Sequence, residues 1–162
     1  PAIALGLEPH SDAVMLDRPR PRREGILTRA FLTKVAVEGA VMSAVTIGAF
    51  HLGLSAGGQP VGATMAFATL CLSRLFHGFS CKGAGPVLFT RRFWNNPTLL
   101  LAFAVGAGLL GAALMVPGFR GVMQAAGLPP TLGLAVIGLA AGSFGVVQAL
   151  KALGNILVRS IP

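Results

Sequence analysis

The sequence predicts an all-α membrane protein whose four transmembrane helices form two antiparallel hairpins, with both termini in the cytoplasm. Residues 98–117 run for twenty positions without a charged side chain, which at about 1.5 Å per residue is long enough to cross a hydrocarbon core of roughly 30 Å. Hydrophobic residues make up 54% of the chain and stand in long runs rather than in alternation, which favours helices over a membrane β-barrel. Basic residues gather beside these runs, and their distribution predicts the orientation.

Three other stretches are also long enough to span a membrane. The four predicted spans are residues 31–54, 61–80, 98–117 and 132–150. The short segment SAGGQP joins the first two spans and predicts an antiparallel hairpin. Asn95, Asn96 and Pro97 precede the third span, and a proline in the first turn suits the start of a helix. We therefore expect residues 31–162 to form one four-helix transmembrane region.

The basic residues predict the topology. The chain carries thirteen Lys and Arg residues and a formal net charge of +8. Ten of the thirteen lie before the first span, between the second and third spans, or at and after the end of the fourth, whereas Arg120 is the sole basic residue in the other two connections. Because cytoplasmic loops are rich in Lys and Arg, both termini and the middle loop are predicted to be cytoplasmic. Contact with anionic membrane lipid also suits this charge, and nucleic-acid binding does not, since no aromatic residues interleave with the N-terminal basic run.

The first 30 residues differ in composition from the rest. The opening segment PAIALGLEP has no initiator methionine and starts within an apolar run, so the chain looks like an excerpt from a longer one. Residues 8–25 hold three prolines and four of the five carboxylates of the chain, among them Glu8, Asp12 and Asp17. This composition predicts an extended connector without regular structure.

Ionisable residues within the spans are the candidate functional residues, because a charge at the centre of a membrane helix costs about 2.5 to 3.5 kcal/mol on insertion scales. Glu38 on the first span and Arg74 on the second lie at similar depths, which suggests an intramembrane ion pair. Lys34, one helical turn from Glu38, is an equally good partner. His77 follows Arg74 by three residues and is either a structural histidine near the interface or part of a proton or ion relay.

Familiar catalytic and metal-binding motifs are absent from the sequence. It contains no GxxxxGK[ST] phosphate loop, no CxxC pair, no HExxH motif and no pair of carboxylates within the spans. We expect no catalytic residue and no metal site in this chain, and we expect Cys71 and Cys81 to be free thiols. Small residues at spacing four predict close helix packing on the third and fourth spans. They are Ala104, Gly108 and Ala112, and Gly138 and Gly142.

Four segments together resemble a known family. In order, they are PAIALGLEP, DRPRPRREGILTR, TLCLSRLFHGFSC and LFTRRFWNNPTLLLAF. They are similar, in order and spacing, to the C-terminal membrane region of P-type cation-transporting ATPases of the calcium-pump and sodium-pump branch. The resemblance covers nearly the whole chain. It implies that residues 1–30 hold the end of the pump's sixth transmembrane helix and a cytoplasmic connector, and that the four spans are helices seven to ten.

For function, the resemblance implies ATP-driven transport of a cation, of the calcium type, through a phosphorylated aspartate. ATP and magnesium are implied for the full pump, whose catalytic domains and ion-binding helices lie outside this sequence. The four helices would brace those ion-binding helices, so the expected partners are the rest of the pump, the transported cation and lipid. Glu8, Asp12 and Asp17 are candidate coupling residues in the connector, or else part of a solvated charged loop. We expect a multi-pass protein of a bacterial-type plasma membrane.

Arg74 departs from the family pattern. In calcium-pump relatives the eighth helix contributes an acid or an amide to one ion site, and the segment CLSRLFHGF places Arg74 at that position. An arginine has no acceptor atom and stays protonated, so it cannot coordinate a cation. The resemblance therefore implies a fixed positive charge at this site, with Glu38 and His77 nearby, and one transported ion per cycle.

A free-standing four-helix membrane protein is the alternative from a different class. It would serve as a scaffold, a regulator or a small dimeric transporter. A start codon shortly before Pro1 would favour this alternative, whereas a DKTGT segment several hundred residues upstream would favour the pump.

Overall fold

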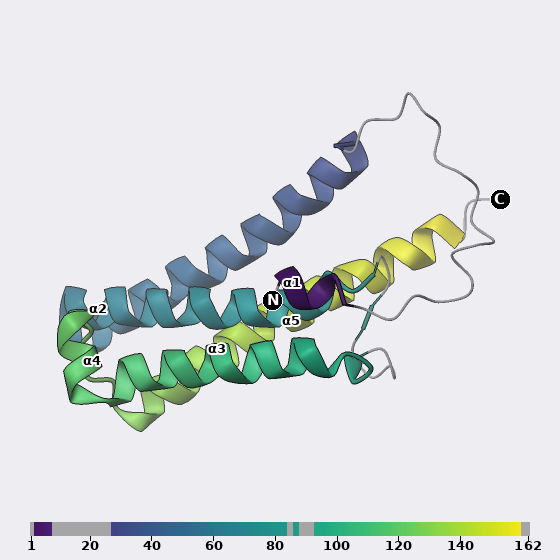
Figure 1. Ribbon diagram of the computed structural model, residues 1–162. Helices are drawn as coiled ribbons and strands as arrows, with labels where there is room; N and C mark the ends of the chain where they lie inside the picture. Colours follow the sequence, from purple (N-terminus) through teal and green to yellow (C-terminus); the bar gives the residue numbers. More distant parts are fainter. Residues whose placement is uncertain (1, 8–26, 84–85, 88–92, 160–162) are drawn as a thin grey trace.

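The computed structural model describes residues 2–7, 27–83, 86–87 and 93–159. These residues form five helices and no strand, which confirms the all-α class. The helices are α1 (Ala2–Leu5), α2 (Arg29–Ser80), α3 (Pro97–Met115), α4 (Pro117–Val122) and α5 (Pro130–Arg159). In Figure 1, α4 lies at the same end of the bundle as the turn of α2, and α1 lies near the other end of α3. The helix α5 packs chiefly against α2.

Three helices are long and apolar enough to cross a membrane. They are Phe31–Ser80 within α2, Pro97–Met115 and Pro130–Gly154 within α5. The 52 residues of α2 exceed the length of one crossing, and its backbone leaves the helical conformation at Gly57 and Gly58. Gly58 has a φ of 77°, a left-handed conformation that favours glycine. Figure 1 shows α2 turning back here, so that it has a first arm, residues 29–56, and a second arm, residues 59–80.

The two arms of α2 meet backbone to backbone beside this turn. A Cβ atom built on Gly53 would lie 2.7 Å from the Cα of Gly62, and one built on Gly62 would lie 2.9 Å from the carbonyl oxygen of Phe50. Only residues without side chains allow so close an approach. The predicted spans 31–54 and 61–80 coincide with the two arms, although the structure joins them in one kinked helix. Figure 1 shows the arms diverging away from the turn.

The start of α3 lies where the sequence predicts it. Asn96 is the N-cap, and its side-chain oxygen accepts a hydrogen bond of 2.9 Å from the amide of Leu99, while Pro97 stands in the first turn. The helix ends at Met115, two residues before the predicted end of the span. It stops there because Pro117, which has no amide hydrogen to donate, begins the short helix α4 after a break at Val116.

The last helix is longer than its predicted span. An apolar run predicts a span at 132–150, whereas α5 runs from Pro130 to Arg159. The extension arises because helix formation does not require an apolar sequence, so α5 continues past the end of the hydrophobic run. Lys151, predicted at the end of the span, therefore lies inside α5.

The core consists of two clusters. Near the turn of α2, buried residues of α2 and α5 pack together: Ala49, Met65, Ala68 and Val136. At the opposite end, buried residues of α1, α2, α3 and α5 meet: Ala4, Phe79, Leu99 and Phe144. Phe79 stacks on Phe93 with ring centroids 4.6 Å apart, and Phe76 lies 5.8 Å from Phe144. These aromatic contacts hold the second arm of α2 against α5 and the residues before α3.

The small residues at spacing four predict close packing without naming a partner, and most of them are exposed in the structure. Ala104 and Gly108 on α3, and Gly138 and Gly142 on α5, are exposed. A Cβ atom on any of these three glycines would meet nothing within 4 Å among the atoms described. Among the described residues, a close backbone contact joins Gly53 to Gly62. Because the two stripes are exposed, they are available to neighbours outside the described residues.

Candidate functional site

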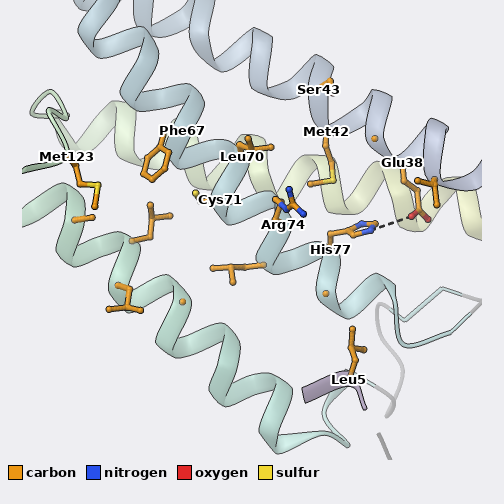
Figure 2. A pocket seen from close by; sticks show the side chains of 18 residues that line it. Leu5, Glu38, Met42, Ser43, Phe67, Leu70, Cys71, Arg74, His77 and Met123 are labelled. Atoms are coloured by element: carbon orange, nitrogen blue, oxygen red, sulfur yellow. Dashed lines mark ion pairs between the residues drawn. The ribbon is translucent and has the colours of Figure 1, made fainter. Parts of the chain in front are cut away.

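A groove of about 950 Å³ lies between the two arms of α2 and α3 (Figure 2). Most of its lining is apolar, and Leu5 of α1 and Met123 lie toward opposite ends of it. Its ionisable lining residues come from both arms of α2: Glu38 from the first arm, and Cys71, Arg74 and His77 from the second. An apolar groove that carries a few converging charged groups is the usual form of a functional site.

Helix periodicity explains why these side chains share the groove. Residues three or four apart lie on the same face of a helix, so Cys71, Arg74 and His77 form one row along the second arm. Glu38 and Met42 form the corresponding row on the first arm. Since α2 folds back at Gly57 and Gly58, the two rows face each other, as Figure 2 shows.

Glu38 is held between two basic residues. Its Oε2 atom lies 3.5 Å from Nε2 of His77, and its Oε1 atom lies 3.8 Å from Nζ of Lys151 on α5. The side chain of Glu38 is 12% exposed and that of Lys151 is 6% exposed. A carboxylate withdrawn this far from water requires nearby positive charge. Lys151 provides it, and His77 adds to it only when protonated.

The predicted partners of Glu38 are therefore wrong. The sequence suggested Arg74 or Lys34, whereas the structure brings Glu38 to His77 and Lys151. The physical reason is exposure. Lys34 is exposed, and so is Arg74, so neither needs a carboxylate as strongly as the buried ammonium of Lys151 does.

Arg74 lies on the wall of the groove. Within the parts of the chain that the structure describes, its guanidinium forms no hydrogen bond and no ion pair. It is exposed, and Figure 2 shows it between Cys71 and His77 on the second arm of α2. Inserting an arginine into a membrane on such a helix costs free energy, so an anionic group or water must lie near its charge.

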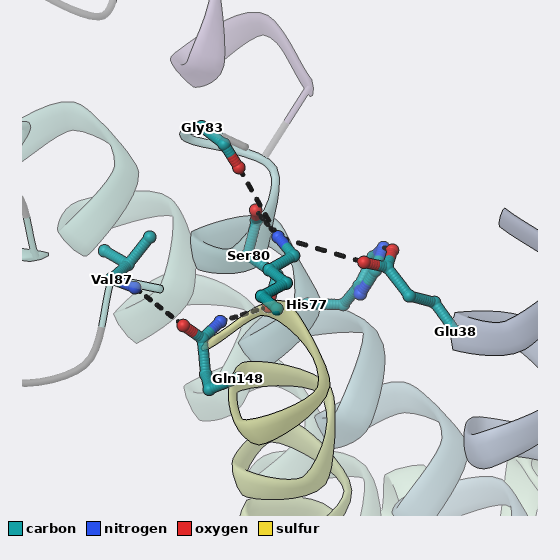
Figure 3. A network of polar contacts seen from close by, with 7 residues as sticks. Glu38, His77, Ser80, Gly83, Val87 and Gln148 are labelled. Atoms are coloured by element: carbon teal, nitrogen blue, oxygen red, sulfur yellow. Dashed lines mark hydrogen bonds and ion pairs between the residues drawn. The ribbon is translucent and has the colours of Figure 1, made fainter. Parts of the chain in front are cut away.

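A polar network lies behind Glu38 (Figure 3). The ammonium of Lys151 donates a hydrogen bond to the carbonyl oxygen of Ser80 and approaches that of Gly83 at 3.5 Å. One turn earlier on α5, Gln148 donates to the hydroxyl of Ser80 at 2.7 Å and accepts from the amide of Val87 at 2.6 Å. Through these contacts, α5 holds the end of α2 and the segment that follows it.

Sequence reasoning missed this network. Lys151 was counted only as one of the basic residues that set the topology, and Gln148 and Ser80 were not singled out. The available signal was the spacing of Gln148 and Lys151, which places two long polar side chains on one face of an otherwise apolar helix. The residues that they contact lie 68 and 71 positions away, and such contacts leave no local pattern.

Several predicted residues lie elsewhere. Glu8, Asp12 and Asp17 fall outside the described residues. Both cysteines are free thiols, which confirms that prediction. Across residues 2–7, 27–83, 86–87 and 93–159, no three His, Cys, Asp or Glu side chains come together in a way that could hold a metal ion.

Long apolar helices around a groove with a buried ion pair define an integral membrane protein of the helical-bundle class. The family model described as "Cation transporting ATPase, C-terminus" matches residues 1–153. The chain belongs to this family.

Individual relatives agree with the family match. The chain is 31% identical over its whole length to the calcium-transporting ATPase type 2C member 2 of Mus musculus, and covers 17% of that protein. It is 30% identical over 98% of its length to a calcium-transporting ATPase of Bacillus subtilis, again covering 17% of the relative. A calcium-transporting ATPase of Listeria monocytogenes is 29% identical over 96% of the chain and is covered to 18%. The chain thus spans about a sixth of the length of these relatives.

Proposed function

We propose that this chain is the C-terminal membrane region of an ATP-driven calcium-type cation pump, in which it braces the ion-binding helices. The observation that carries the proposal is the family match over residues 1–153. The relatives at 31% and 30% identity are named as calcium-transporting ATPases, which favours calcium as the cargo.

In this proposal the chain crosses the membrane four times, with the two arms of α2, α3 and α5 as the four crossings. The turn at Gly57 and Gly58 supports two crossings within α2. Both termini and the loop between α2 and α3 are placed in the cytoplasm, because the Lys and Arg residues concentrate there. The relatives in Bacillus subtilis and Listeria monocytogenes support a bacterial-type plasma membrane as the location.

The bracing role rests on the surfaces that the described helices leave uncovered. Large apolar side chains are exposed on every long helix, including Ile47, Leu101 and Leu134. The small-residue stripes of α3 and α5 also face outward, and such stripes allow neighbouring helices to approach closely. We propose that the remaining helices of the pump, together with lipid, cover these faces.

Arg74 is proposed to act as a fixed positive charge beside the ion path. It lies on the groove wall with no ion pair among the described residues, and Glu38 and His77 lie beyond it along the same groove. A guanidinium has no lone pair to offer a cation. Its positive charge would take the place of one bound ion and would repel a cation from that position. The pump would then move one cation per cycle.

ATP and magnesium are assigned to parts of the pump outside this chain. The groove is walled by apolar side chains of membrane-length helices, and its ionisable groups do not suit a nucleotide. Glu8, Asp12 and Asp17 are proposed to couple those outer parts to the helices, since they lie on the connector between α1 and α2.

The complete gene product provides the test. It would be expressed in membrane vesicles, and ATP-dependent calcium uptake and ATP hydrolysis would be measured together. We expect ATP-driven uptake with a ratio close to one calcium per ATP, and a higher ratio in Arg74→Gln, which restores an amide. Arg120→Gln, on α4, is the matched control and should leave the ratio unchanged.

Two outcomes would count against the proposal. A ratio of two in the wild-type pump would overturn the role of Arg74. Absence of ATP-driven cation uptake would overturn the pump itself and favour a free-standing membrane scaffold or regulator.

A further inference from the structure

We infer that the ammonium of Lys151 is a built-in cation that fills an oxygen-lined site at the end of α2, a site whose chemistry suits a free monovalent cation. In this role Lys151 is a positioning residue that ties α5 to both arms of α2. The inference rests on the geometry of this network and stands apart from the proposed pump function.

Three oxygen atoms surround the ammonium. They are the carbonyl oxygen of Ser80, the carbonyl oxygen of Gly83 at 3.5 Å and Oε1 of Glu38 at 3.8 Å. Figure 3 shows Ser80 and Gly83, at and just after the end of α2, converging with Glu38 of the first arm. Carbonyl and carboxylate oxygens are the ligands that potassium ions and other hard cations prefer.

Two of these oxygens carry full or partial negative charge that a nearby cation stabilises. Ser80 is the last residue of α2, and carbonyls at the end of a helix carry the negative end of its dipole. Oε1 of Glu38 is fully buried and, within the described part of the chain, accepts no hydrogen bond. The Lys151 ammonium lies at the centre of this arrangement, and the whole residue is only 8% exposed.

The surrounding residues fix the oxygens without help from Lys151. Gln148 donates to the hydroxyl of Ser80 at 2.7 Å and accepts from the amide of Val87 at 2.6 Å, so it holds the segment around the site. His77 orients Glu38 through the 3.5 Å contact with Oε2. Removal of the amine should therefore leave a partly formed cavity with its oxygen ligands in place.

The test replaces Lys151 by methionine in the full-length protein and compares potassium chloride with choline chloride at equal concentration. Hydrogen–deuterium exchange, read by mass spectrometry, follows the peptide around residues 80–87, where the amides of Cys81 and Val87 are hydrogen-bonded. In choline we expect exchange about tenfold faster than in wild type, the change that a loss of about 1.4 kcal/mol in local stability produces. In potassium the exchange should return most of the way to the wild-type rate.

Matched variants separate a cation site from a mere loss of hydrogen bonds. Arg120→Met removes a basic residue of α4, at the opposite end of the bundle, and should show no dependence on potassium. Adding Glu38→Gln to Lys151→Met removes the charged ligand and should abolish the potassium effect. If Lys151→Met does not fold, Lys151→Gln replaces it, because its amide retains one donor for the carbonyl of Ser80.

Two results would overturn the inference. One is exchange in Lys151→Met that is equally fast in potassium and choline, since the oxygens would then not form a cation site. The other is a potassium effect of the same size in Arg120→Met or in the wild type, since potassium would then act elsewhere.

Discussion

At the scale of single residues, the contact between Gly53 and Gly62 is the most restrictive feature of α2. A Cβ atom at either position would come within 2.9 Å of the backbone of the opposite arm. We expect Gly53→Ala to destabilise the protein by about 1 to 3 kcal/mol, because the arms must move apart to accept the methyl group. The measurement is the thermal unfolding midpoint of the full-length protein in detergent, followed by size-exclusion chromatography of heated samples.

Gly48→Ala is the control for this substitution. Gly48 lies on the same arm, and a Cβ atom there would meet nothing within 4 Å. This change should leave the midpoint unchanged or raise it slightly, because alanine favours helices over glycine by about 1 kcal/mol. An equal loss in both variants would show that the loss is not caused by the contact between the arms.

Sequence reasoning reached only part of the candidate site at this scale. Glu38, Arg74 and His77 were selected because they are ionisable residues inside apolar spans, and the structure places all three on one groove. Their pairing was not predictable, because the sequence gives the depth of a residue in a span but not which face of the helix meets which neighbour. Lys151 pairs with Glu38 through the packing of α5 on α2, which only the fold reveals.

At the scale of elements, Asn96 connects the start of α3 to α1. Its side-chain oxygen caps α3 by accepting from the amide of Leu99, and its Nδ2 atom donates to the carbonyl oxygen of Ala4, both at 2.9 Å. Asn96→Ala should cost about 1 to 2 kcal/mol, because it removes an N-cap and a buried hydrogen bond. The loss of stability would be measured as faster hydrogen exchange of the backbone amides in the first turn of α3.

The neighbouring asparagine gives a matched control. Asn95 is exposed and accepts a hydrogen bond of 2.9 Å from Lys82. Asn95→Ala should therefore change the free energy of local opening of α3, read from hydrogen exchange, by less than about 0.5 kcal/mol. Unchanged protection of α3 in Asn96→Ala would mean that Pro97 and the packing of Leu99 fix the start of the helix without the cap.

Features of the helices that depend on neighbouring residues were predictable from the sequence, whereas features that depend on tertiary packing were less predictable. The predicted apolar runs lie almost entirely within long helices. Asn96 and Pro97 predicted the start of α3, since a cap and a first-turn proline act within one helical turn. The fourth predicted span ends nine residues before the end of α5, because hydropathy marks the membrane-length part of a helix rather than its full extent. The stripes of small residues on α3 and α5 predict close packing without naming a partner, and most of their residues face outward.

At the scale of the whole molecule, the two ends of the bundle have different roles. Near the turn of α2, an apolar cluster packs α2 against α5. At the other end, the arms diverge, the groove opens, and the Lys151 network holds α5 against the end of α2. Both ends are packed, so the groove between the diverging arms is the part that suits a neighbouring helix.

The orientation of the bundle gives the last prediction. Asn95, in the loop before α3, should lie on the cytoplasmic side, while Ser55, near the turn of α2, should lie on the opposite side. The reason is that the loop holds Lys82, Arg91 and Arg92, whereas the turn holds no basic residue, and Lys and Arg stay in the cytoplasm. Asn95→Cys and Ser55→Cys would each be labelled with a membrane-impermeant maleimide in sealed vesicles of both orientations.

Mass spectrometry of the labelled peptides decides the outcome. Asn95→Cys should react only in inside-out vesicles and Ser55→Cys only in right-side-out vesicles, whereas Met123→Cys, after α4, should follow Ser55→Cys. The second arm of α2 then crosses the membrane, because the turn and the loop lie on opposite sides. Labelling of Ser55→Cys and Asn95→Cys from the same side would mean that the second arm does not cross, and would leave α2 as a re-entrant hairpin whose charges do not set its orientation.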